Sequence, residues 1–201
     1  MAVRVEENLE RMRRGLSTGA DHLGLEAAVA DGDIDGFNVS LTGRCYEILV
    51  REAPMASDLR LVVSVVRVLN ELERISDHAV AVCEGAPGVV GSASGTAIHD
   101  LLVTMCDDVV ERFRTARRGW GAMDIGLAEE LAGGSALTEA LHARLVRELL
   151  ALDGADAVPV ALAAAGVARS LERICDHTTV IGARLRYLIT GDPNHLAAEV
   201  R

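Results

Sequence analysis

Apolar residues recur every three or four positions along two long stretches of the chain. In residues 58–84 the apolar stripe consists of Leu59, Val62, Val66, Leu69, Leu72, Ile75 and Ala79. A period near 3.6 residues predicts an amphipathic helix, which ends before Gly85 and Pro87. The second helix is predicted at residues 159–190, because Pro159 suits a first helical turn and Gly191 a helix end. The first helix would be about 40 Å long at ~1.5 Å per residue, so both can form the spine of a bundle.

Shorter helices are predicted from the remaining pattern at residues 6–14, 38–52, 97–118 and 136–152. Ser135 is a candidate N-cap for the last of these. Gly15, Gly19 and Gly24 each cost about 1 kcal/mol relative to alanine inside a helix, which predicts a bent or frayed N-terminal region. We therefore expect an all-α protein of six helices, arranged as two antiparallel three-helix units.

The two spine helices carry almost the same seven residues. LERISDH at 72–78 recurs as LERICDH at 171–177, and LVRE at 49–52 recurs in the same order at 145–148. The spacings of 99 and 96 residues suit two copies of a half-domain and are too long for a short solenoid repeat. We predict that helix 58–84 superposes on helix 159–190 through a pseudo-twofold relation, with Glu73 over Glu172 and Asp77 over Asp176.

The predicted boundaries follow from the Gly, Pro and Ser residues between the two copies. They place the first repeat at residues 1–88, the second at 96–192 and a C-terminal tail at 193–201.

Composition supports helices and argues against several functions. Half of the 201 residues are hydrophobic but only 2% are aromatic, which favours helix-on-helix packing through aliphatic side chains. The net charge of −10 would repel a phosphate backbone, so direct nucleic-acid binding is disfavoured. The N-terminus lacks the apolar core of a signal peptide, and no apolar run could span a bilayer. Four scattered cysteines fit small buried residues in a reducing compartment. A cytoplasmic protein is expected.

Each spine helix carries two carboxylates one helical turn apart, Glu73 with Asp77 and Glu172 with Asp176. Like charges at this spacing destabilise a helix unless a positive group compensates. One interpretation is a solvated or salt-bridged face, with arginines on the same helix as partners. The other is a metal site, because carboxylates one turn apart can converge on a hard cation in a helical bundle.

Two further groups of polar residues accompany these carboxylates. His78 and His177 follow the aspartates, and each is expected to be a hydrogen-bonded partner that could orient a metal-bound carboxylate. Asp31, Asp33 and Asp35 in ADGDIDG lack the glutamate at position twelve that calcium loops require. These aspartates instead predict a turn with helix-capping residues.

The segments PMASDLRLVVSVV with LERISDHA, and ARSLERICDHTTVIGARLRYLITGD, resemble the two signature helices of the PhoU family of phosphate-uptake regulators. The resemblance implies six helices in two similar three-helix bundles and a non-enzymatic regulator. It implies two partners, the ATPase of a phosphate ABC transporter and a sensor histidine kinase, and leaves open whether the chain forms a homodimer. It also implies a multinuclear iron or zinc cluster held by E(D)xxxD motifs, which fall on Glu73 with Asp77 and Glu172 with Asp176.

This chain departs from the family pattern at several acidic positions. The D-x-x-x-D element of the second helix falls around Asp31 to Asp35. In the second repeat the same element falls on SALTE, where Glu139 is the acid that remains. A further acid survives as Glu84 in the first repeat, but its counterpart is Ala183. We therefore expect metal binding to be stronger in the first half than in the second, or lost altogether.

Two other classes of protein stay open from the sequence. A metal-free helical adaptor explains everything except the duplicated carboxylate pairs. A ferritin-like di-metal carboxylate protein also repeats acids on helices, but it requires histidine three residues after a glutamate, whereas here the spacing is five. No Ser/His/Asp, Cys/His or glycine-rich phosphate-binding motif is recognisable, so no catalytic activity is predicted.

Overall fold

The protein is a bundle of helices in a computed structural model that describes residues 1–91 and 96–200. The helices are α1 (Ala2–Thr18), α2 (His22–Glu52), α3 (Ala56–Gly85), α4 (Thr96–Ala122), α5 (Ile125–Leu131), α6 (Ala136–Leu150) and α7 (Ala157–Thr190), with 3₁₀ helices η1 (Ala86–Gly88) and η3 (Pro193–Val200). No strand occurs in these described residues. The all-α prediction is confirmed, with six long helices and the short additional α5.

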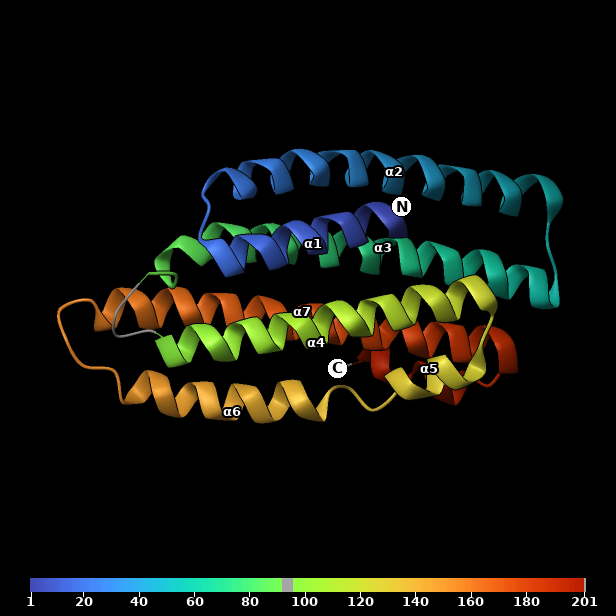
Figure 1. The fold of residues 1–201 in the computed structure, drawn as a ribbon. Coiled ribbons are helices and arrows are strands. Elements are labelled where there is room, and N and C mark those ends of the chain that lie inside the picture. The colour runs from blue at the N-terminus through green and yellow to red at the C-terminus, as the bar shows by residue number, and fades with distance from the viewer. Residues whose placement is uncertain (92–95, 201) are drawn as a thin grey trace.

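The helices form layers in the order that a duplicated three-helix unit requires (Figure 1). The α2 helix lies outermost on one side, α1 and α3 lie beneath it, α4 and α7 form the next layer, and α5 and α6 cover the opposite side. Helix α3 packs on α1 and α2, and α7 correspondingly packs on α4, α5 and α6. The two LERI segments therefore have equivalent neighbours, and α3 packs directly against α7.

The contact between α3 and α7 lies along the buried part of each apolar stripe. In α3 this part includes Leu69, Leu72, Ile75 and Ala79 but not Leu59, which is 41% exposed. Ile75 and Ile174, which occupy equivalent places in the repeated string, are both fully buried. The rings of His78 and His177 stack at 5.7 Å between centroids, with an interplanar angle of 20°. Equivalent residues of two copies touch each other only near the axis that relates the copies. If the two halves are related by the predicted pseudo-twofold axis, that axis passes close to this histidine pair.

The prediction of a turn at ADGDIDG is wrong, because residues 30–36 lie in the middle of α2. Helix α2 begins at His22 instead of residue 38, after α1 ends at Gly19 in the left-handed conformation. Glycine and aspartate favour turns by propensity, but tertiary packing overrides a weak local preference. Ile34, in the centre of the segment, is fully buried and anchors it as helix.

The second repeat breaks the helix that corresponds to α2 into α5 and α6. Gly133 and Gly134 separate the two pieces, and Gly134 has a φ of +70°. Ser135 then caps α6, its side chain accepting a hydrogen bond of 3.0 Å from the Thr138 amide, as the sequence predicted. The break places a helix N-terminus beside the carboxylates of α7.

Two simple features concern the helices and the cysteines. Within the described ranges, none of the helices has the length and apolar character needed to cross a membrane. All four cysteines, Cys45, Cys83, Cys106 and Cys175, are buried and free.

Gly182 provides a test of the packing between α5 and α7. A Cβ at Gly182 would lie 2.7 Å from Leu131 Cβ, closer than real contacts allow. Gly182→Ala is therefore expected to lower the free energy of unfolding by about 1–2 kcal/mol through overpacking. The matched control is Gly166→Ala on the same helix, where nothing lies within 4 Å and alanine should add up to ~1 kcal/mol. Urea unfolding measures both, and equal changes in the two variants would contradict the packing described.

Candidate functional site

Helices α2 and α3 bring four carboxylates together in the first half of the molecule. Asp31 and Asp35 lie one turn apart on α2, and Glu73 and Asp77 lie one turn apart on α3, which packs along α2. The charges of Asp31, Asp35 and Glu73 each raise the pKa of at least one other carboxyl of the four. The side chains of Ser76 and Asp77 act in the opposite sense and lower the pKa of Asp31. We call Asp31, Asp35, Glu73 and Asp77 the first acidic site.

Partial desolvation and mutual repulsion make this site bind protons unusually well. Desolvation is the largest cause, and together with the charges of Glu73, Asp31 and Asp35 it raises the pKa of Asp77 to about 6, while Arg74 opposes the shift. Burial likewise raises the pKa of Glu73 and that of Asp31. Asp77 therefore takes up a proton at a higher pH than an ordinary aspartate does. A bound cation could replace this proton.

The floor of the first acidic site is polar and incompletely hydrogen-bonded. Asn8 of α1 is fully buried and donates from Nδ2 to Ser76 Oγ at 2.9 Å, so α1 fixes the hydroxyl that faces Asp31. Asp31 Oδ1 is buried and lacks a hydrogen-bond partner in the described structure. A buried carboxylate oxygen without a partner is costly, and a ligand can satisfy it.

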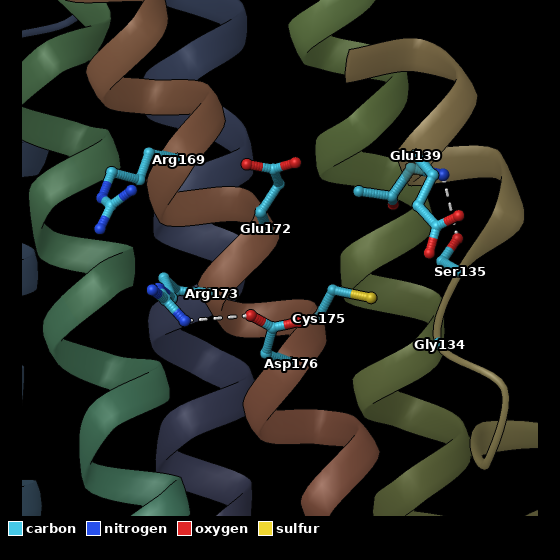
Figure 2. Close-up of a pocket in the computed structure, with 9 residues that line it drawn as sticks. Gly134, Ser135, Glu139, Arg169, Glu172, Arg173, Cys175 and Asp176 are labelled. Carbon is cyan, nitrogen blue, oxygen red and sulfur yellow. Dashed lines mark hydrogen bonds and ion pairs between the residues drawn. The ribbon is translucent and has the colours of Figure 1, made fainter. Parts of the chain in front are cut away.

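The second half has an open groove of about 320 Å³ at the corresponding place. Figure 2 shows Glu172 and Asp176 on α7 beside the start of α6, which carries Ser135 and Glu139. The groove is lined by Gly134, Ser135, Thr138, Glu139, Arg169, Glu172, Arg173, Cys175 and Asp176.

Basic and polar groups in this groove already engage the carboxylates. Glu172 Oε1 lies 2.8 Å from Nδ1 of His142, and Asp176 Oδ2 lies 3.3 Å from NH1 of Arg173. The carboxylates of α7 thus have nitrogen partners within 4 Å, whereas the described residues show no such ion pair for Glu73 or Asp77. A cation therefore meets less competition in the first half.

In the second half an acid, Asp108, lies on α4. The hydroxyls of Ser135 and Thr138 donate to Asp108 Oδ2 of α4 at 2.6 and 2.7 Å. Ser135 and Cys175 both line the groove. In the sequence, SALTE at residues 135–139 corresponds to the element at Asp31 to Asp35, so Ser135 falls at an acidic position and donates to Asp108 together with Thr138.

Glu84 lies apart from the other predicted site residues of the first half. It is two helical turns beyond Asp77, about 10 Å along the axis, and contributes to a separate hollow with Asp21 and Gly24 at the start of α2. Its counterpart Ala183 is buried. The structure therefore brings together Asp35, Glu73 and Asp77, and separately Glu139, Glu172 and Asp176, but leaves Glu84 outside both groups.

The two histidines face the boundary between the repeats. His177 Nδ1 lies 2.6 Å from Glu71 Oε2 on α3, and both side chains are largely buried. Burial lowers the pKa of His78, and the neighbouring His177 adds to the effect. His177 is also within electrostatic range of Glu73, where it partly opposes the rise in the pKa of that carboxyl. The predicted role of these histidines in orienting metal ligands stays a prediction.

The side chains are not arranged as a formed metal site. Across residues 1–91 and 96–200, no three His, Cys, Asp or Glu side chains converge closely enough to hold a metal ion. Binding would require the carboxylates of the first acidic site to turn toward one another.

Two residues near the carboxylates have weak signals in the sequence. The glycines and aspartates around Asp31 predict a turn, but the four-residue spacing of Asp31 and Asp35 matches that of Glu73 and Asp77 and is a signal for two facing helices. Asp108 is not predicted as a site residue by any motif. Asp108 follows Asn8 by 100 residues, which is close to the repeat spacing. The two polar residues therefore lie on corresponding helices, α1 and α4, and this spacing is the signal in the sequence.

Comparison with known proteins gives consistent matches over nearly the whole chain. The family model described as the PhoU domain matches residues 1–86 and 102–185. A phosphate-specific transport system accessory protein PhoU homolog of Deinococcus radiodurans is 30% identical over 174 residues, covering 86% of this chain and 81% of the relative. The PhoU crystal structure from Pseudomonas aeruginosa aligns with a TM-score of 0.89 at 26% identity, over 96% of this chain and 93% of that one.

A second solved structure supports the fold alone. The phosphate transport system regulatory protein PhoU from Streptococcus pneumoniae aligns with a TM-score of 0.76 at 20% identity, over 95% of this chain and 90% of that one.

Proposed function

The chain belongs to the PhoU family, and we propose that it is a non-enzymatic accessory regulator of a phosphate-specific transport system. The support is that curated relatives over most of its length carry the name of that accessory protein, including one from Escherichia coli that is 26% identical over 97% of this chain. We further propose that it connects the ATPase of the transporter with a sensor histidine kinase. The four free, buried cysteines suit work in the reducing cytoplasm.

We propose that the first acidic site binds a hard metal cation, and the observation that carries this is the pairing of two carboxylates on α2 with two on the adjacent α3. Four carboxylates on two facing helices offer only oxygen donors, which hard cations such as ferric iron prefer, and zinc also accepts. The partnerless Oδ1 of Asp31 gives such an ion a buried ligand. These residues fit an iron or zinc ion once their side chains converge, and the ion would supply positive charge that ties α2 to α3.

A metal-free adaptor is the second candidate function. It is favoured by the lack of three convergent ligands in the described part of the chain. In that case the carboxylates would serve as a charged surface, and the regulatory role would be unchanged. Elemental analysis of protein purified without a metal-affinity tag distinguishes the two candidates.

Deleting the gene tests the regulatory proposal. Phosphate-starvation genes are expected to rise several-fold in phosphate-rich medium, because the link between transporter and kinase is lost. A reporter fused to a phosphate-starvation promoter measures this, with the restored gene as control. Unchanged reporter activity in the deletion strain, at both high and low phosphate, would contradict the proposal. The purified protein is expected to hydrolyse no phosphate ester.

A further inference from the structure

The outer side of α2 carries a continuous row of apolar and glycine residues. They follow a spacing of four, three, four, three along almost the whole helix: Leu25, Val29, Gly32, Gly36, Val39, Gly43, Tyr46 and Val50. This is the spacing of the a and d positions in a coiled-coil helix. We call these eight residues the α2 outer face. All eight are exposed, and Figure 1 shows α2 at the edge of the bundle with no helix covering it.

The α2 outer face is distinct from the side that packs on the core. Ala27 and Ile34, on the inner side of the helix, are fully buried. On the outer face, Val50, Val39 and Leu25 are 83%, 76% and 73% exposed. A surface helix normally presents polar residues to water. A helix that is apolar on two sides usually has a packing partner on each of them.

Three glycines in the outer face have no role within the chain. A Cβ on Gly32, Gly36 or Gly43 would meet nothing within 4 Å. By contrast, the helical Gly24 lies against Glu84 and the helical Gly182 against Leu131, so close packing accounts for those glycines. Glycine weakens a helix relative to alanine, and its benefit is that another backbone can approach closely. The outer face is therefore shaped for a helix that packs tightly along α2.

The charges beside the α2 outer face indicate which kind of partner helix would pack on it. Helix α2 contains six acidic residues against two arginines, and Glu26, Asp33 and Glu47 directly flank the outer face. A second copy of α2 would bring the same acidic flanks together. We propose that the α2 outer face binds a partner helix whose own apolar stripe is flanked by lysine or arginine. This proposal adds a binding surface to the proposed regulatory role. Its expected effect in the cell rests on that proposed role, whereas the binding itself does not.

The probe for the binding test is a synthetic helical peptide about four heptads long, with leucine and alanine at a and d and lysine at e and g. Its twin carries glutamate at e and g. Isothermal titration is expected to show binding of the lysine peptide to the wild-type protein, and at least about tenfold weaker binding of the glutamate twin. Equal binding of the two peptides would overturn the charge part of the proposal.

Gly36→Gln distinguishes a docking defect from a folding defect, because it should raise the stability of the protein while it weakens peptide binding. Glutamine is a better helix former than glycine and adds no apolar surface, so the melting temperature should rise by about 2–4 °C. The long side chain should also block close approach and weaken the lysine peptide at least about tenfold. Gly166→Gln on α7 is the matched control: it should raise the melting temperature similarly and leave peptide binding unchanged. Unchanged peptide affinity in Gly36→Gln protein would overturn the proposal.

Two further measurements complete the test. Sedimentation velocity shows whether the wild-type chain dimerises and whether Gly36→Gln abolishes the dimer, in which case a second copy occupies the face and the basic partner is wrong. In the deletion strain carrying the promoter reporter, Gly36→Gln should fail to restore repression whereas Gly166→Gln should restore it. Full restoration by Gly36→Gln would overturn the docking proposal alone, while a deletion strain with no phenotype would overturn the regulatory function instead.

Discussion

Asp77→Ala is expected to remove the tighter metal-binding event of this protein, and Asp176→Ala to leave it in place. The first acidic site offers Asp31, Asp35, Glu73 and Asp77, and one of their oxygens is buried without a partner. Hard cations need several oxygen ligands to offset their dehydration, so each lost carboxylate lowers affinity. Loss of an outer partner alone costs about 10- to 100-fold in metal affinity, so loss of the direct ligand Asp77 should cost about 100-fold or more.

The second half is expected to bind the same ion more weakly. Glu172 is in contact with His142 and Asp176 with Arg173, so an incoming cation must displace a positive or hydrogen-bonded neighbour. In the sequence, Ser135 falls where the first half has the acid Asp31. Asp176→Ala should therefore change only the weaker event.

Titration of the apo protein with Zn²⁺ or iron, followed by calorimetry, measures both events. Arg173→Ala serves as a control for the second half, since it frees Asp176 without removing a carboxylate. Equal losses in Asp77→Ala and Asp176→Ala proteins, or a larger loss in the latter, would show that the predicted asymmetry is wrong.

The repeat made most of the fold predictable from the sequence. The strings around Glu73 and Glu172 identified two equivalent helices, and their 3.6-residue stripes gave the faces that meet between α3 and α7. Those stripes are long, so a few exceptions do not hide the period. The same strings carried the resemblance to the PhoU family, which the comparisons bear out.

The parts that could not be predicted depend on tertiary contacts. The segment around Asp33 is rich in glycine and aspartate and resembles a turn, and only the burial of Ile34 against the core makes it helical. The apolar outer face of α2 further hides the helical period, because both sides of the helix are apolar there. In the second half, the hydrogen bonds from Ser135 and Thr138 to Asp108 join residues about thirty positions apart, which no local pattern reports.

Proton binding at Asp77 gives the apo and metal-bound proteins opposite responses to pH. The pKa of Asp77 is raised from 3.8 to about 6 in the folded protein, so the folded state binds the proton more tightly than the unfolded state does. The apo protein should therefore lose stability as pH rises from about 4 to 6, and stay at the lower level above pH 6. The full shift corresponds to about 3 kcal/mol, but Asp77 is exposed to solvent, and screening should reduce the penalty to about 1 kcal/mol.

A metal ion should reverse this trend, because it binds the carboxylates only where they are deprotonated. At a concentration 100 times its dissociation constant, the ion should stabilise the protein by about 2.7 kcal/mol above pH 6, a rise in melting temperature of about 5–10 °C. The gain should disappear as pH falls toward about 4. Asp77→Asn removes the titrating group and a ligand at nearly constant volume, so it should melt higher than the wild type without metal at pH 8 and gain little from metal. Thermal melts of both proteins across this range, with chelator or with metal, test the linkage. A single pH profile shared by wild type and Asp77→Asn would show that the first acidic site neither holds this proton nor binds the ion.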